Sequence, residues 1–165
     1  MNQIIILLEI QGSRRDPEFT VKINGHTVNG HVVCLEKIKH LSRIMYEIDP
    51  IELKEQNQLS IEMNDKNDED NICPSTGEFV DHHISIKQIR IDDVDADALL
   101  FKKSYFRHSM SKEWIEQMKV QGHDILDCYQ PGTDMHINGI MTFEFNMPFW
   151  LDKVFFIDQA HKSGE

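Results

Sequence analysis

Residues 83–92 read HISIKQIRID, and this stretch decides the fold class because its isoleucines alternate with polar residues. Ile84 and Ile86 share one parity, whereas Ile89 and Ile91 share the other. Successive side chains of a strand point to opposite faces, so a regular strand would bury only one of these pairs. One extra residue near Lys87-Gln88 restores the phase, and the sequence therefore predicts a strand with a β-bulge.

Four further segments show the same period of two, which is typical of half-buried strands. Their apolar positions are Phe19, Val21 and Ile23; Ile44, Tyr46 and Ile48; Leu59, Ile61 and Met63; and Met141, Phe143 and Phe145. Asn-Gly pairs at 24–25 and 138–139 are strong turn signals, and residues 32–35 are expected to return from the first turn as a strand. The opening MNQIIILLEI is expected to be a strand rather than a secretion signal, because it has no basic region and no cleavage site follows.

One segment has a helical pattern instead. Ser111 is suited to cap a helix, Trp114, Ile115 and Met118 have helical spacing, and Gly122 would end it. Several short strands with one short helix near 111–121 indicate an all-β protein, an antiparallel β-sandwich with jelly-roll topology. We expect a single domain over residues 1–158 and a frayed tail over 159–165. Its inter-sheet core should include Ile86, Ile91, Phe143 and Phe145.

The charge of the chain restricts its partners. The formal net charge is −11 at pH 7, which argues against nucleic acid and against an anionic membrane surface. The three cysteines, Cys34, Cys73 and Cys128, show no C-x-x-C spacing. Such cysteines suit reduced thiols, so we expect the chain to be made in a cytoplasm.

The first candidate site is the acidic stretch NDKNDEDN at 64–71. It is not an EF-hand, because that loop needs glycine at its sixth position and glutamate at its twelfth, where this chain has Asp70 and Thr76. A solvated loop is the expected interpretation. The alternative is a looser calcium site in which Asp65, Asp68, Asp70 and Asp81 converge. We expect no cofactor, and calcium is the one alternative.

Two other clusters of polar residues are weaker candidates. Asp93, Asp95 and Asp97 recur at period two, but like charges on one strand face repel each other, so a turn is expected there. Among nine histidines there is no H-E-x-x-H motif. His82 and His83 would point to opposite faces of a strand, which argues against a metal shared by these two neighbours.

No sequence motif of a hydrolase, nucleotide-binding loop or dinucleotide fold is present, so we expect a protein that is not an enzyme. Two carboxylates meeting across the sandwich, as in glycoside hydrolases, stay an alternative. The aromatic residues Tyr105, Trp114 and Trp150 are candidate contacts for a partner protein or for a sugar ring. Core packing is the competing interpretation of these side chains.

The order of the segments QLSIEMNDKNDEDN, DHHISIKQIRIDDVDADALLFKKSYF and NGIMTFEFNMPFWLDKVFF resembles small β-sandwich proteins of large contractile-tailed phages, notably cyanophages. The first half is also similar to calcium-dependent xylan-binding modules, in which an acidic loop holds the ion that holds the sugar. The phage resemblance covers residues 21–156.

This resemblance implies a non-enzymatic structural or accessory protein of a virion, in the capsid decoration, neck, tail or fibres. Its expected partners are other virion proteins, with no nucleic acid and no membrane, and its location is the virion after synthesis in the host cytoplasm. The alternative function is a carbohydrate-binding module for attachment to a host surface glycan.

Overall fold

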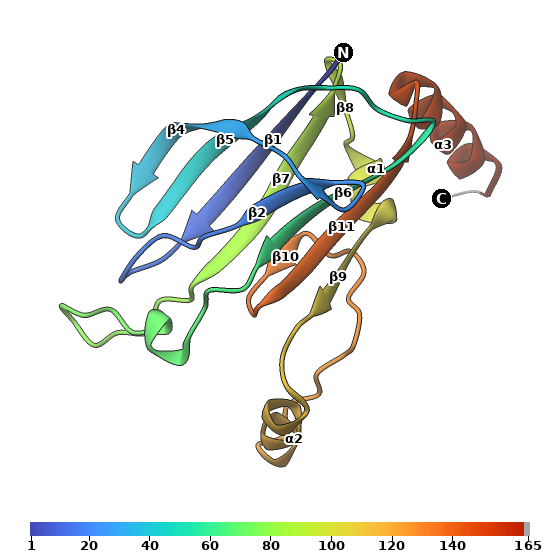
Figure 1. Ribbon diagram of the computed structural model, residues 1–165. Coiled ribbons are helices and arrows are strands. Elements are labelled where there is room, and N and C mark those ends of the chain that lie inside the picture. The colour runs from blue at the N-terminus through green and yellow to red at the C-terminus, as the bar shows by residue number, and fades with distance from the viewer. Residues whose placement is uncertain (164–165) are drawn as a thin grey trace.

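A computed structural model describes residues 1–163 and contains two antiparallel sheets (Figure 1). Sheet A has the order β10 (Asp134–Met135), β7 (His83–Ile91), β1 (Asn2–Gln11), β5 (Leu41–Ile51) and β4 (Gly30–Ile38), with β8 (Val94–Asp95) also paired to β7. Sheet B has the order β3 (His26–Thr27), β2 (Thr20–Ile23), β6 (Gln56–Met63), β11 (Gly139–Asn146) and β9 (Ser104–His108). The predicted all-β class and antiparallel arrangement are confirmed, and the whole is β-sandwich-like.

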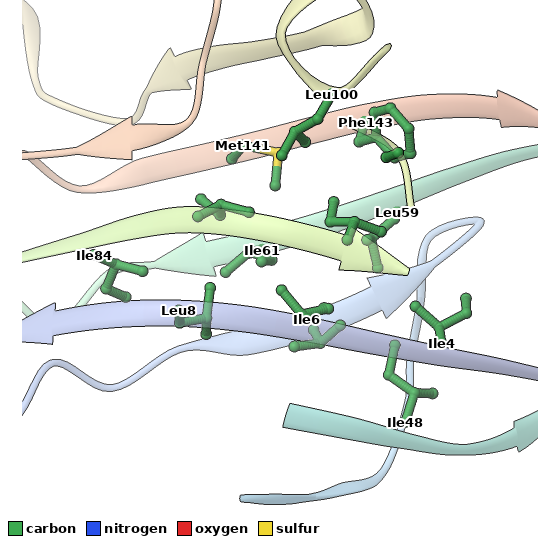
Figure 2. Packing of buried hydrophobic residues seen from close by; sticks show 14 of the residues in the cluster. Ile4, Ile6, Leu8, Ile48, Leu59, Ile61, Ile84, Leu100, Met141 and Phe143 are labelled. Carbon is green, nitrogen blue, oxygen red and sulfur yellow. The ribbon is translucent and has the colours of Figure 1, made fainter. Parts of the chain in front are cut away.

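The core lies between the two sheets, and the longer strands β1, β6, β7 and β11 contribute most of its residues. Figure 2 shows Ile4, Ile6 and Leu8 of β1 facing Leu59 and Ile61 of β6. Burial of this apolar surface is the main force that holds the sheets together. All four residues predicted for the core are buried, namely Ile86, Ile91, Phe143 and Phe145.

The predicted bulge in β7 is confirmed. Leu7 of β1 pairs with Gln88 and the next residue, Leu8, pairs with Ile86, so Lys87 is the extra residue. The inserted residue restores the phase of the strand, and all four isoleucines of β7 are buried.

The first Asn-Gly turn is confirmed, but its returning strand is not the predicted one. Asn24 and Gly25 both have positive φ, as a two-residue hairpin turn requires, and Ile23 pairs with His26. The returning strand is therefore β3, directly after the turn. Residues 32–35 belong to β4, which pairs with β5 in the other sheet.

The second Asn-Gly pair does not form a hairpin. The strands on either side of it, β10 and β11, lie in different sheets. Gly139 begins β11, and a Cβ at this position would come within 2.3 Å of the carbonyl oxygen of Arg107. A glycine is therefore required here because β11 approaches β9 closely, and not because the chain turns.

The predicted helix is α2 (Lys112–Val120), in which the Ser111 hydroxyl accepts a hydrogen bond from the Trp114 backbone N–H. The expectation of one helix is wrong, because the structure also has α1 (Ala98–Lys103), α3 (Phe149–Ser163) and a 3₁₀ turn, η1 (Asp68–Asn71). α3 includes residues 159–163 of the expected tail, whereas 164 and 165 lie outside the described residues. Of the helices within residues 1–163, none is long and apolar enough to cross a membrane.

Candidate functional site

The acidic loop after β6 contacts an arginine from the loop between β1 and β2. The guanidinium group of Arg15 forms ion pairs with Asp65 and Asp70, with 3.0 Å between Arg15 Nη2 and Asp70 Oδ2. Asp70 lies at the end of the 3₁₀ turn η1, where its carboxylate also accepts the Asn67 backbone N–H at 2.8 Å. This loop is therefore pinned to the N-terminal part of the chain.

Asp70 is only 3% exposed, so the solvated-loop interpretation is wrong for this residue. Burial alone would raise the pKa of Asp70, but the Asn67 backbone N–H and Arg15 outweigh it and lower that pKa. Asp65 is likewise shielded beside Arg15, whereas Asp68 is exposed as expected. The positive charge near Asp65 and Asp70 is thus supplied by Arg15.

His82 is fully buried next to this ion pair. Its Nε2 lies 3.9 Å from Asp65 Oδ2, and neither ring nitrogen has a hydrogen-bond partner among the described atoms. Burial lowers the pKa of His82, and the neighbouring carboxylates of Asp70 and Asp65 only partly oppose this shift. The ring is therefore neutral near pH 7. It packs in the interior beside the ion pair of Arg15 with Asp65.

Asp81 belongs to a separate cluster just before β7. Its Oδ1 accepts a hydrogen bond from Lys66 Nζ at 2.9 Å, and its Oδ2 lies 2.5 Å from His136 Nδ1 and 3.6 Å from His83 Nδ1. Burial would raise the pKa of Asp81, but the bonds from His136 and Lys66 hold it far below its usual range. The bond to Asp81 raises the pKa of His136, whereas burial lowers that of His83.

The structure therefore places the four predicted calcium ligands in three different surroundings. Asp65 and Asp70 surround Arg15, Asp68 points to solvent, and Asp81 joins two histidines. The ligand atoms of Asp81, His83 and His136 lie within 4.8 Å of one another. Among residues 1–163, these three form the cluster of side chains that could hold a metal ion. The cluster was missed in the sequence because β7 and β10 are far apart along the chain.

The second acidic cluster forms the expected turn. Asp92 and Asp93 have positive φ between β7 and β8, where Ile91 pairs with Val94. Asp95 then contacts Arg90, and Asp97 contacts Lys153 of α3. These carboxylates hold the turn and the neighbouring helices in place.

A polar hollow lies on the outer face of sheet B. It has a volume of about 740 Å³ and is lined by polar side chains of β6, β9 and β11 and of the adjoining segments, namely Asn24, Gln56, Asn57, Gln58, Lys102, Lys103, Tyr105, Gln130, Glu144 and Asn146, together with Phe145. The strand register explains this gathering. Glu144 lies opposite Gln58 and Asn146 opposite Gln56, with their side chains on the face that points away from the core.

Hydrogen bonds hold the lining of this hollow in place. The Tyr105 hydroxyl lies 3.3 Å from Glu144 Oε1 and 3.5 Å from Gln58 Nε2. Arg107 lies over the Tyr105 ring, 5.6 Å from its centroid. The Gln130 side chain donates to the Lys102 carbonyl at 2.8 Å. Such bonds restrict rotamers before any ligand arrives.

The three aromatic residues singled out in the sequence occupy different surroundings. Tyr105 lies in the hollow of sheet B. Trp114 of α2 is half-buried and lines a smaller hollow of about 220 Å³ beside Asp81 and His136. Trp150 is 57% exposed on α3 and lines neither of these hollows. Tyr105 is thus the aromatic candidate that the fold surrounds with polar groups.

Comparisons of the chain with protein-family models, curated proteins and solved structures found no match. The resemblance to phage β-sandwich proteins therefore stays a prediction, and function has to be argued from the geometry of the surface.

Proposed function

We propose that this protein binds a carbohydrate in the hollow on the outer face of sheet B. The observation that carries the proposal is the lining of that hollow, which combines Tyr105 with the amide residues Gln56, Gln58, Gln130 and Asn146. Asn24 and Asn57 also line it, but their amides bond each other and the neighbouring backbone. Sugar hydroxyls both donate and accept hydrogen bonds, and an amide side chain offers both kinds of partner. An aromatic ring adds an apolar face on which a pyranose can stack.

The hollow is suited to binding rather than to glycoside hydrolysis. Hydrolysis requires two carboxylates on either side of the scissile bond. Among the described lining residues Glu144 is the one carboxylate, and its Oε1 is engaged by Tyr105. The proposed function is therefore non-enzymatic and does not depend on calcium, since the aspartates of the acidic loop do not line this hollow.

The test is affinity electrophoresis through native gels that contain xylan, hydroxyethyl cellulose, mannan or alginate. We expect at least one polysaccharide to retard the protein, also in the presence of a chelator. Tyr105→Ala and Gln58→Ala should lose most of the retardation. Trp150→Ala serves as the matched control, because it removes an exposed aromatic residue outside the hollow. Equal retardation of Tyr105→Ala and the wild type would contradict the proposal.

We propose a second function, assembly with a second copy of this chain, because of the edge strand β4. Every residue from His31 to Ile38 is exposed, including Val32 at 57% and Leu35 at 53%. An exposed apolar edge can pair with another strand through its free backbone groups. In an antiparallel pair with a two-fold axis between Glu36 and Lys37, each carboxylate would face the ammonium group of the other copy.

The resemblance described above supports placing such an assembly in a tailed-phage particle, with surface glycan as the ligand of the hollow. Jelly-roll topology and a virion location stay predictions of that resemblance. Mass spectrometry of purified particles would test the location, and absence of the protein from them would contradict it.

A further inference from the structure

The backbone of sheet A brings a carboxylate and two imidazoles to one face of the sheet. His83 begins β7 and Asp81 lies two residues before it. His82 between them is buried, whereas Asp81 and His83 are partly exposed, so these two side chains lie on the same side of the chain. β10 pairs with β7 through Asp134 with Ser85 and Met135 with Ile84. Continuing this antiparallel register by one residue places His136 opposite His83. Inner-face neighbours such as Ile84 and Met135 are buried in the core, so the three polar residues lie on the outer face.

The side chains converge as well. Both Nδ1 atoms, of His83 and His136, face Oδ2 of Asp81, and the two imidazole rings have centroids 5.0 Å apart. We propose that Asp81, His83 and His136 form a binding site for a divalent transition metal ion of the zinc class.

The donor set decides the class of ion. Two imidazoles and one carboxylate are a ligand set of zinc sites, in which three protein ligands leave a position for water or another small ligand. Calcium prefers oxygen ligands alone and is not expected here. The smaller hollow beside Trp114 borders Asp81 and His136, and its volume of about 220 Å³ leaves room for that further ligand.

Binding needs small adjustments of both histidine ligands. Two atoms that bind the same zinc ion at about 2.0 Å each lie roughly 3.3 Å apart in tetrahedral geometry. His83 Nδ1 lies 3.6 Å from Asp81 Oδ2, close to this spacing, but it also lies 3.3 Å from the Asp81 carbonyl oxygen, a hydrogen bond that it would give up to an ion. His136 is hydrogen-bonded to Oδ2 at 2.5 Å. The His136 side chain is 58% exposed, so its ring can withdraw and exchange its proton for the ion.

Lys66 distinguishes a metal site from a plain network of ion pairs. Its ammonium group binds Oδ1 of Asp81, leaves Oδ2 to the histidines and also donates to the His136 carbonyl. Without an ion, the lysine balances the charge of Asp81. With an ion bound at Oδ2, two positive charges share one carboxylate and repel each other. Removal of the lysine charge should therefore strengthen metal binding, although it would weaken a network of ion pairs.

The experiment is calorimetric titration of the chelator-treated full chain with Zn²⁺, with visible spectroscopy of the Co²⁺ form to report nitrogen coordination. We expect one ion per chain. His83→Ala and His136→Ala each remove one ligand and should weaken zinc binding by about tenfold or more. Loss of a residue that only supports a ligand already has an effect of about this size. Lys66→Met should bind more tightly than the wild type.

His40→Ala is the matched control, because His40 Nε2 lies 3.9 Å from Cys73 Sγ and forms the competing pair of nitrogen and sulfur donors. It should bind zinc like the wild type. Circular dichroism of each variant checks that the sheets are intact. Three results would overturn the proposal: no binding by the wild type, affinities of His83→Ala and His136→Ala equal to that of the wild type, or weaker binding by Lys66→Met.

Discussion

At the scale of single residues, the contrast between Phe143 and Asp70 shows what the sequence can and cannot predict. Phe143 lies on the apolar side of an alternating segment, and local periodicity alone predicted its burial correctly. Asp70 lies in a run of polar residues that is typical of a solvated loop. Its burial depends on Arg15, which is 55 residues away in the sequence and which no local pattern connects to it.

For Phe143, we predict that substitution by alanine lowers the free energy of unfolding by about 3–5 kcal/mol, the usual cost of truncating a buried aromatic residue. The ring packs against Phe145 and Phe149, so the cavity would lie within an aromatic cluster. Urea denaturation monitored by circular dichroism measures the change. A loss below about 1 kcal/mol would be incompatible with a fully buried ring.

For Asp70, we predict that Asp70→Asn destabilises the protein by about 1–3 kcal/mol, because Arg15 and the Asn67 N–H lose a charged acceptor. Asp68→Asn is the matched control in the same turn and should stay within about 0.5 kcal/mol of the wild type. Equal effects of the two substitutions would contradict the buried ion pair.

The Asp70 effect should also depend on pH, with a sign that follows from its lowered pKa. A carboxyl group with a lower pKa in the folded state stabilises the fold above its unfolded pKa of about 3.9 and loses this contribution as the pH falls through the folded pKa. The difference in stability between wild type and Asp70→Asn should therefore shrink as the pH falls below about 4. Urea denaturation at a series of pH values from neutral to acid measures it.

At the scale of elements, local signals predicted the bulge in β7 and the hairpin at Asn24-Gly25, because both follow from the phase and turn chemistry of adjacent residues. The partners of β4 and the role of Asn138-Gly139 were not predictable in this way. Both depend on which sheet a strand joins after a loop, and strands of this fold cross repeatedly between the sheets. α1 was missed because six residues are too few to show a helical period.

The edge strand β4 gives the prediction at this scale. If two copies pair through β4, the double variant Val33→Lys/Leu35→Lys should shift the protein from dimer to monomer, because charged residues on an edge strand oppose pairing. Light scattering after size-exclusion chromatography measures the mass of each form. Val120→Lys, at an exposed position of α2, is the control and should stay dimeric. A wild type that is monomeric at high concentration would exclude this mode of assembly.

At the scale of the whole molecule, the two sheets have separate tasks. Their inner faces form one core, whereas the outer face of sheet B carries the polar hollow and sheet A carries the cluster of Asp81, His83 and His136 and the free edge. The sequence predicted the sandwich because alternation is local. It could not predict the hollow, whose lining comes from segments between residues 24 and 146 that only strand register brings together.

The most direct test of carbohydrate binding is a ¹H–¹⁵N titration of the labelled protein with an oligosaccharide of the polysaccharide that retards it in native gels. The proposed function predicts that the largest shift changes cluster on Gln58, Tyr105, Gln130, Glu144 and Asn146, with little change in β4 and α3. Shift changes centred on β4, on α3 or on the Asp81 cluster, with the hollow of sheet B unaffected, would contradict it.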